Sequence, residues 1–72
     1  MKDSNGREAR LGNRVKLWEN FYGRVVCSFD DEQFSEEYPR SDWGYLKKGM
    51  LILTDSGELF HYAESDEDFE VI

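Results

Sequence analysis

The sequence predicts an all-β protein: a small, closed, five-stranded barrel with a long, partly helical-turn insertion between its second and third strands. Two observations support this prediction. Five short segments have the apolar alternation or the β-branched content of strands, and no segment has the apolar spacing of a long helix. Five such strands within 72 residues bury both apolar edges most simply by closing on themselves.

The expected strands cover residues 14–18, 24–29, 50–54, 58–63 and 69–72. The first alternates polar and apolar side chains, as a half-buried strand does. The second is mostly β-branched or apolar. Asp55, Ser56 and Gly57 are expected to form a three-residue hairpin loop between the third and fourth strands, with Gly57 in the left-handed position.

Residues 1–10 have no apolar periodicity and are expected to form a flexible tail, so that residues 11–72 make a single domain. The chain has neither a leader-like apolar segment nor an apolar run longer than residues 50–53, so a soluble, cytoplasmic protein is expected. Cys27 is the only cysteine, which excludes an internal disulfide and fits a reducing compartment.

The order of these signals resembles an SH3-like barrel. A Gly-Asn-Arg-Val opening begins at Gly12, a Gly-Arg-Val-Val strand begins at Gly23, and a central hairpin and a short terminal strand follow. The resemblance covers residues 11–72 and implies the architecture alone. The resemblance does not extend to the signalling SH3 domains, because this sequence lacks their Ala-Leu-Tyr-Asp-Tyr stretch and their tandem tryptophans. The chain is also loosely similar to small proteins of bacterial mobile elements and integron cassettes, a similarity that implies no function.

Nineteen residues, 30–48, separate the second and third expected strands, and we call this segment the excursion. Loops longer than about a dozen residues in a compact domain are typically functional or disordered. The excursion carries large apolar side chains that favour a folded segment over one end of the barrel, namely Phe34, Tyr38, Trp43, Tyr45 and Leu46.

Two helical turns are expected within the excursion. Ser35 followed by two glutamates predicts a capped turn that ends at Pro39. Ser41 or Asp42 can begin a second turn that runs through Leu46.

Two interpretations of the excursion remain open from the sequence. In the first, Trp43, Tyr45 and Leu46 plug the barrel end and the acidic residues form a solvated rim. In the second, the aromatic residues line a groove whose acidic edge binds Arg or Lys side chains by cation–π contacts and ion pairs. The candidate binding residues are then Tyr38, Trp43, Tyr45, Trp18, Tyr22, Asp31, Glu36 and Glu37.

The net charge of −7 is unevenly distributed. Residues 1–29 include six basic and three acidic residues, which gives this part a net charge of +3. Residues 30–72 include three basic and thirteen acidic residues, which gives a net charge of −10. This field disfavours direct binding to nucleic acid or to anionic membranes, and it attracts basic partners.

The sequence shows no catalytic, cofactor or metal motif. His61 is the only histidine, and a Cys27–His61 catalytic pair is disfavoured because both residues lie inside strands. The acidic run Glu64 to Glu70 lacks the ligand spacing of an EF-hand. A family of short SH3-like dihydrofolate reductases carries a Val-Gln-Ile-Tyr stretch, of which residues 59–62 keep only the tyrosine, so that activity is not expected.

The function expected from these observations is a non-enzymatic module that binds a protein or peptide with basic residues through the excursion. A structural homo-oligomer is the first alternative, since exposed aromatic residues and open strand edges can be covered by a second copy. An acidic nucleic-acid mimic that inhibits a basic protein is the second alternative.

Overall fold

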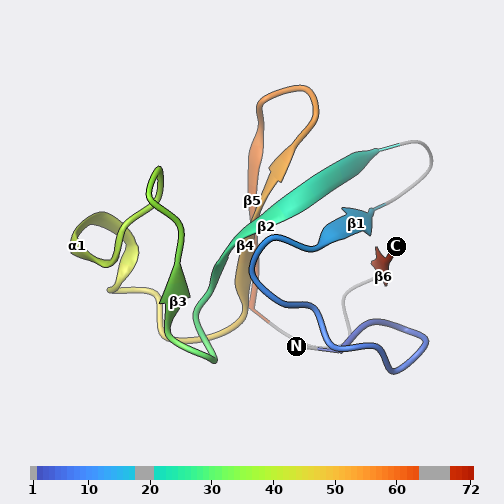
Figure 1. Ribbon diagram of the computed structural model, residues 1–72, viewed down its shortest axis with the longest axis horizontal. Helices are drawn as coiled ribbons and strands as arrows, with labels where there is room; N and C mark the ends of the chain where they lie inside the picture. The colour runs from blue at the N-terminus through green and yellow to red at the C-terminus, as the bar shows by residue number, and fades with distance from the viewer. Residues whose placement is uncertain (1, 18–20, 64–68) are drawn as a thin grey trace.

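The computed structural model describes residues 2–17, 21–63 and 69–72. Its strands are β1 (Arg14–Lys16), β2 (Tyr22–Ser28), β3 (Gln33–Phe34), β4 (Met50–Thr54), β5 (Leu59–Tyr62) and β6 (Glu70–Val71). A four-residue helix, α1 (Arg40–Trp43), lies between β3 and β4. The strands form an antiparallel sheet in the order β5-β4-β2-β1-β6, with β3 paired to β2 (Figure 1).

The prediction of an all-β protein is confirmed, and β1, β2, β4, β5 and β6 correspond to the five expected strands. The closed barrel is not formed: in the described part of the chain, β5 and β6 end the strand order and no pairing joins them. The pairing of β6 with β1 explains why. Ile72 N–H donates to Arg14 O, so Ile72 belongs to a hydrogen-bonded pair of the β1–β6 ladder. Hydrogen-bonded and non-hydrogen-bonded pairs alternate in an antiparallel ladder, and the N–H and C=O of the next residue, Val71, therefore point away from β1. The N-terminal segment, rather than β5, takes those groups.

The N-terminal segment is a folded turn, which we call the N-terminal turn (residues 2–9), and not the flexible tail expected from the sequence. Val71 N–H donates to Asp3 Oδ2 at 2.8 Å, and Arg7 Nη1 donates to Val71 O at 3.1 Å. Asp3 Oδ1 accepts two further backbone N–H groups within the turn. Asp3 is 6% exposed and Ala9 is 1% exposed. The turn is ordered because its carboxylate and its one small apolar side chain both find partners in the sheet.

The sheet has a hydrophobic core on each face. The first core consists of Ala9, Val15, Leu17, Val25, Met50, Ile52, Tyr62 and Phe69. The second core consists of Val26, Cys27, Phe29 and Leu51. Successive side chains of a strand point to opposite faces, so the continuous apolar run of β4 supplies both: Met50 and Ile52 to the first core, Leu51 to the second.

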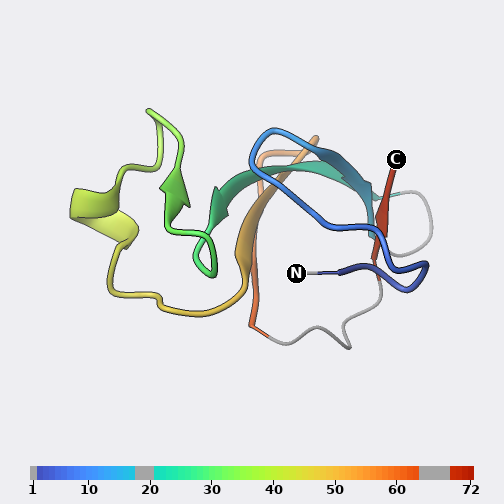
Figure 2. The same cartoon turned by 60° about the horizontal axis from the view of Figure 1, so that its bottom comes forward.

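Different segments cover the two cores. The N-terminal turn contributes Ala9 to the first core, and Phe69 joins it just before β6. The excursion packs partly buried side chains against the second core. The two covering segments lie at opposite ends of the molecule, with α1 and β3 at one end and the N-terminal turn and β6 at the other (Figures 1 and 2).

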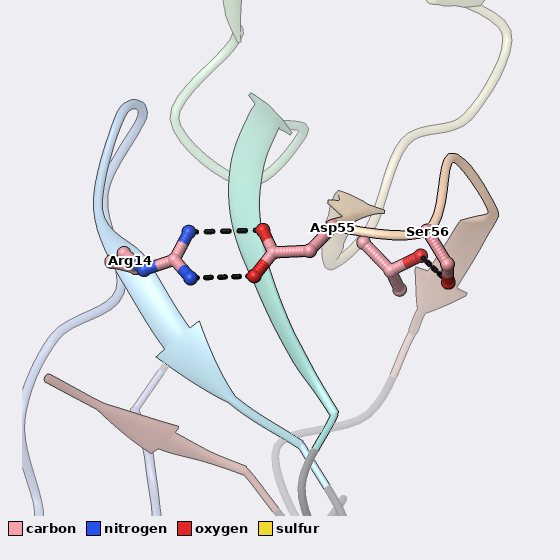
Figure 3. Close-up of polar contacts among 4 residues, drawn as sticks. Arg14, Asp55 and Ser56 are labelled. Carbon is pink, nitrogen blue, oxygen red and sulfur yellow. Dashed lines mark hydrogen bonds and ion pairs between the residues drawn. The ribbon is translucent and has the colours of Figure 1, made fainter.

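A bidentate ion pair holds the β4–β5 hairpin loop against β1. Arg14 Nη1 and Nη2 donate to Asp55 Oδ1 and Oδ2 at 3.0 Å and 2.6 Å, across the face of β2 (Figure 3). Asp55 N–H donates to Tyr22 O, and Gly57 has a φ of 90°. The three-residue loop with a left-handed glycine is therefore confirmed.

Candidate functional site

The excursion begins with a return strand that the sequence did not predict. β3 runs back along the end of β2, with Cys27 opposite Phe34 and Ser28 opposite Gln33. The connecting turn places Glu32 at a φ of 54°, and Glu32 N–H donates to Phe29 O. Two residues are too short for an alternation pattern, so no sequence signal marks this strand.

Of the two helical turns expected in the excursion, the second is present as α1, which begins at Arg40, one residue before Ser41. Residues 36–38 form a bend closed by a hydrogen bond from Tyr38 N–H to Ser35 O, and no helix forms there. The helix is α1, and Pro39 precedes it with its carbonyl accepting Asp42 N–H and Trp43 N–H. Proline suits this position because the first residues of a helix have no intrahelical partner for their N–H groups. Pro39 therefore begins the helix as well as ending the preceding bend.

The two ends of the excursion meet at Gly49. Phe29 N–H donates to Gly49 O at 2.9 Å, and Gly49 N–H donates to Asp30 Oδ1 at 3.0 Å. Gly49 has a φ of 83°, and a Cβ there would collide with the carbonyl oxygen of Tyr62. Only glycine fits this position, and it closes the base of the excursion.

Arg40 fixes α1 against β3. Its guanidinium lies 5.0 Å from the centroid of the Phe34 ring, Nη1 donates to Glu32 Oε1, and Nη2 donates to Glu32 O. A cation–π contact and two hydrogen bonds from one side chain restrict how α1 can move relative to β3. The excursion is thus held both at its base and at its helix.

The aromatic residues of the excursion divide into two groups. Tyr38 and Trp43 are half-buried against the second core, with their ring centroids 5.9 Å apart in an edge-to-face arrangement, and Leu46 packs beside them. Tyr45 is 70% exposed. Trp43 and Leu46 cover the sheet as the plug interpretation expects, and Tyr38 covers it as well. The plug interpretation is wrong for Tyr45, whose side chain is largely in solvent.

The other candidate residues are placed less uniformly. Tyr22 begins β2, at the end of that strand away from β3, which pairs with Cys27 and Ser28. Its ring contacts the guanidinium of Arg14 instead. Trp18 lies outside the described residues. Asp31 Oδ2 accepts a hydrogen bond from Ser28 Oγ at 3.0 Å, so it supports the β2–β3 turn.

A hollow of about 330 Å³ lies beside the excursion. Its lining includes Glu36 and Glu37 together with residues that the sequence analysis did not propose as binding residues. β1 and β3 pair with the same edge of β2, one along its first half and one along its end. The hollow lies where they diverge. It is lined by residues 11–12, 24–26 and 35–37, and we call it the edge hollow.

Two polar features mark the edge hollow. Arg24 and Glu37 approach each other to 3.6 Å across it, with both side chains more than half exposed. Ser35 Oγ is buried and has no hydrogen-bond partner in the described residues. Finding these residues from sequence would require the register of β1 and β3 on β2, which no local pattern supplies.

Cys27 and His61 do not form a catalytic pair. Cys27 lies opposite Leu51, which in turn lies opposite His61, so a strand separates them by about 10 Å. Cys27 Sγ donates to Tyr38 O at 3.3 Å, and His61 Nε2 lies 2.9 Å from Lys48 O. Burial raises the pKa of the Cys27 thiol, which keeps it protonated at neutral pH.

The described ranges contain no group of three or more His, Cys, Asp or Glu side chains placed to hold a metal ion. The expected acidic run lies mostly in residues 64–68, outside those ranges. Within the same ranges, no helix has the length and apolar character needed to cross a bilayer.

Comparisons with protein-family models, curated proteins and solved structures find no significant match to this chain.

Proposed function

We propose that this chain is a non-enzymatic interaction module that binds a protein or peptide with basic residues through the excursion. The observation that carries this proposal is the way the excursion is held. Gly49 closes its base and Arg40 fixes α1, yet Tyr45 remains 70% exposed beside the half-buried pair Tyr38 and Trp43. An exposed aromatic side chain on a preorganised segment contributes to binding with little loss of conformational entropy.

The charge of the excursion favours a basic partner. It carries six acidic and three basic residues, and the whole chain has a net charge of −7. Two of the acidic residues have structural roles: Asp30 accepts a hydrogen bond from Gly49 N–H, and Glu32 accepts one from Arg40. Glu36 and Glu37 remain at the surface, and among the described residues the only ion pair of Glu37 is its long contact with Arg24. Exposed carboxylates of this kind accelerate association with a cationic partner and contribute to its selection.

We also infer that the sheet is an SH3-like barrel that has opened between β5 and β6. The strand order supports this inference: four strands follow one another by adjacent pairing, and the last strand returns to pair with the first. In this arrangement β3 and α1 are an insertion between the second and third strands of the barrel.

The test is selection from a random peptide library displayed on phage. The wild-type protein should enrich peptides with Arg or Lys, and Tyr45→Ala should lose most of this enrichment. Ile72→Ala is the matched control, since Ile72 is 64% exposed at the opposite end of the molecule. The proposal fails if no peptide family is enriched, or if Ile72→Ala reduces enrichment as much as Tyr45→Ala.

A structural homo-oligomer is the second candidate, favoured by the open edge of β5. The outer edge of β5 pairs with no other described strand, and Leu59 on it is 38% exposed. Repulsion between two chains of charge −7 opposes this association. Light scattering at low and high salt decides it: a dimer that strengthens with salt supports self-association through β5, and a monomer at both salt concentrations excludes it.

A further inference from the structure

We infer that the edge hollow is a subsite for one basic side chain, lysine or arginine, of the bound partner. This inference rests on the proposed function, because it assigns the specificity of the same surface. The hollow is about 330 Å³, at the lower end of the range of about 300 to 1,000 Å³ for ligand pockets. This volume is sufficient for one long side chain.

The lining matches the two parts of a long basic side chain. Leu11 is partly exposed and supplies apolar atoms along which an aliphatic stem can lie, while Val25 and Val26 are buried beneath the hollow. Glu36 and Glu37 lie on the side formed by the excursion, where a terminal cation would end. With Arg24 included, the lining has one basic and two acidic side chains, so its net charge is −1 and it attracts a cation.

The Glu36 and Glu37 carboxylates have unused capacity to bind a cation, and the neighbouring Ser35 hydroxyl lacks a partner among the described residues. Glu36 makes no hydrogen bond or ion pair with another described residue, and Glu37 has only the 3.6 Å contact with Arg24. Ser35 Oγ is buried without a partner in the described ranges, which is unfavourable for a hydroxyl.

Arg24 acts as an internal competitor in this arrangement. Its guanidinium lies 3.6 Å from the Glu37 carboxylate in the free protein, so an incoming cation competes with it for that carboxylate. Removal of the Arg24 charge should therefore strengthen the binding of a basic side chain. The same substitution would abolish binding if the hollow instead accepted an anion, since Arg24 is the only cationic residue in its lining.

The experiment uses three blocked five-residue peptides that differ only at their central residue: lysine, arginine or norleucine. Binding is followed by two-dimensional NMR on the full chain through the amide signals of Gly12, Ser35 and Glu36. Lysine or arginine should shift these signals with an affinity at least about tenfold above that of norleucine. Equal binding of norleucine overturns the inference, as does the absence of shifts with all three peptides.

Variants assign the groups. Glu36→Gln with Glu37→Gln should weaken binding of the basic peptide about five- to tenfold, and Arg24→Gln should strengthen it about two- to fivefold. The matched control is Glu58→Gln with Glu70→Gln, which changes the net charge equally at other exposed positions and should have little effect. Equal weakening by both double variants, or weaker binding in Arg24→Gln, overturns the inference.

The outcome is distinguishable from failure of the proposed function. If phage selection enriches peptides in a Tyr45-dependent manner while the hollow does not discriminate lysine from norleucine, the interaction module stands and the basic subsite does not. If phage selection enriches no peptide, the proposed function itself fails.

Discussion

The two segments that cover the sheet are held in different ways. The N-terminal turn is joined to β6 by the buried carboxylate of Asp3, which accepts three backbone N–H groups, and it places Ala9 in the first core. The excursion is held at its base and by Arg40, and it lays half-buried rings on the second core. It also leaves Tyr45 exposed and Ser35 Oγ without a partner among the described residues.

This difference separates a structural cover from a surface suited to binding. The N-terminal turn buries its Asp3 carboxylate and Ala9 and presents no exposed aromatic side chain. Where apolar and acidic groups remain exposed on a restrained segment, a partner can gain contacts at small conformational cost. The comparison is the basis for proposing that the excursion binds a partner and that the opposite end contributes mainly to stability.

The largest expected effect is on the first core. Phe69→Ala should lower the free energy of unfolding by about 3–5 kcal/mol, because Phe69 is 2% exposed and its ring packs edge-to-face on Tyr62. Urea denaturation followed by circular dichroism measures this loss. A smaller loss in Phe69→Ala than in Trp43→Ala would reverse the assignment of stability to that end of the molecule.

A second effect concerns Asp3 and pH. Burial alone would raise the pKa of this carboxyl, but the N–H groups of Val71, Arg7 and Asn5 and the Arg7 cation outweigh burial and lower it. The folded state is therefore stabilised above the ordinary pKa of an aspartate, and this stabilisation is lost as the pH falls through the lowered value.

Asp3→Asn tests this linkage. The variant should be less stable than the wild type at pH 7, with a smaller loss than in Phe69→Ala, and the two proteins should converge in strong acid. Urea unfolding at pH 7 and pH 3 measures the difference. An unchanged difference between the two pH values would contradict the role of the ionised carboxylate.

The third effect compares two aromatic residues of the excursion. Trp43→Ala should lower the free energy of unfolding by about 1–2 kcal/mol, because its ring is half-buried on the second core. Tyr45→Ala should change it by less than about 0.5 kcal/mol, because Tyr45 is 70% exposed. Thermal denaturation of the two variants measures both changes, and equal losses would show that Tyr45 also covers the core.

The smallest effect is at Ser35. Ser35→Ala removes a buried hydroxyl without a described partner, so it should leave stability unchanged or raise it by up to about 1 kcal/mol. Hydrogen–deuterium exchange of the excursion amides, together with urea denaturation, measures the change. A clear loss of stability would mean that this hydroxyl already has a partner in solution.

The sequence predicted those parts of the fold that local patterns control. Alternation in β1, the apolar run of β4 and the glycine at position 57 are local signals, and the corresponding elements formed. The N-terminal turn was missed because Asp3 is stabilised by Val71, 68 residues away. The open edge of the sheet at β6 was missed for the same reason, since the N–H and C=O of Val71 are hydrogen-bonded to Asp3 and Arg7 of the N-terminal turn.

The candidate site was predicted in part for similar reasons. Tyr38 and Trp43 were expected together and lie together, because few residues separate them in one folded segment. Tyr22 was grouped with them by residue type, but it begins β2 at the end away from β3, and its ring contacts Arg14. The edge hollow depends on how β1 and β3 share one edge of β2, and only the three-dimensional pairing reveals that arrangement.

The closed base of the excursion has a consequence for the evolution and engineering of this fold. Because Phe29, Asp30 and Gly49 bring the two ends together, the chain leaves the sheet and returns to it at nearly the same point. Lengthening a loop whose ends are already joined costs little, about 0.6 kcal/mol for each doubling of its length. New recognition sequences can therefore be grafted between Glu36 and Glu37 while the residues that cover the second core stay in place.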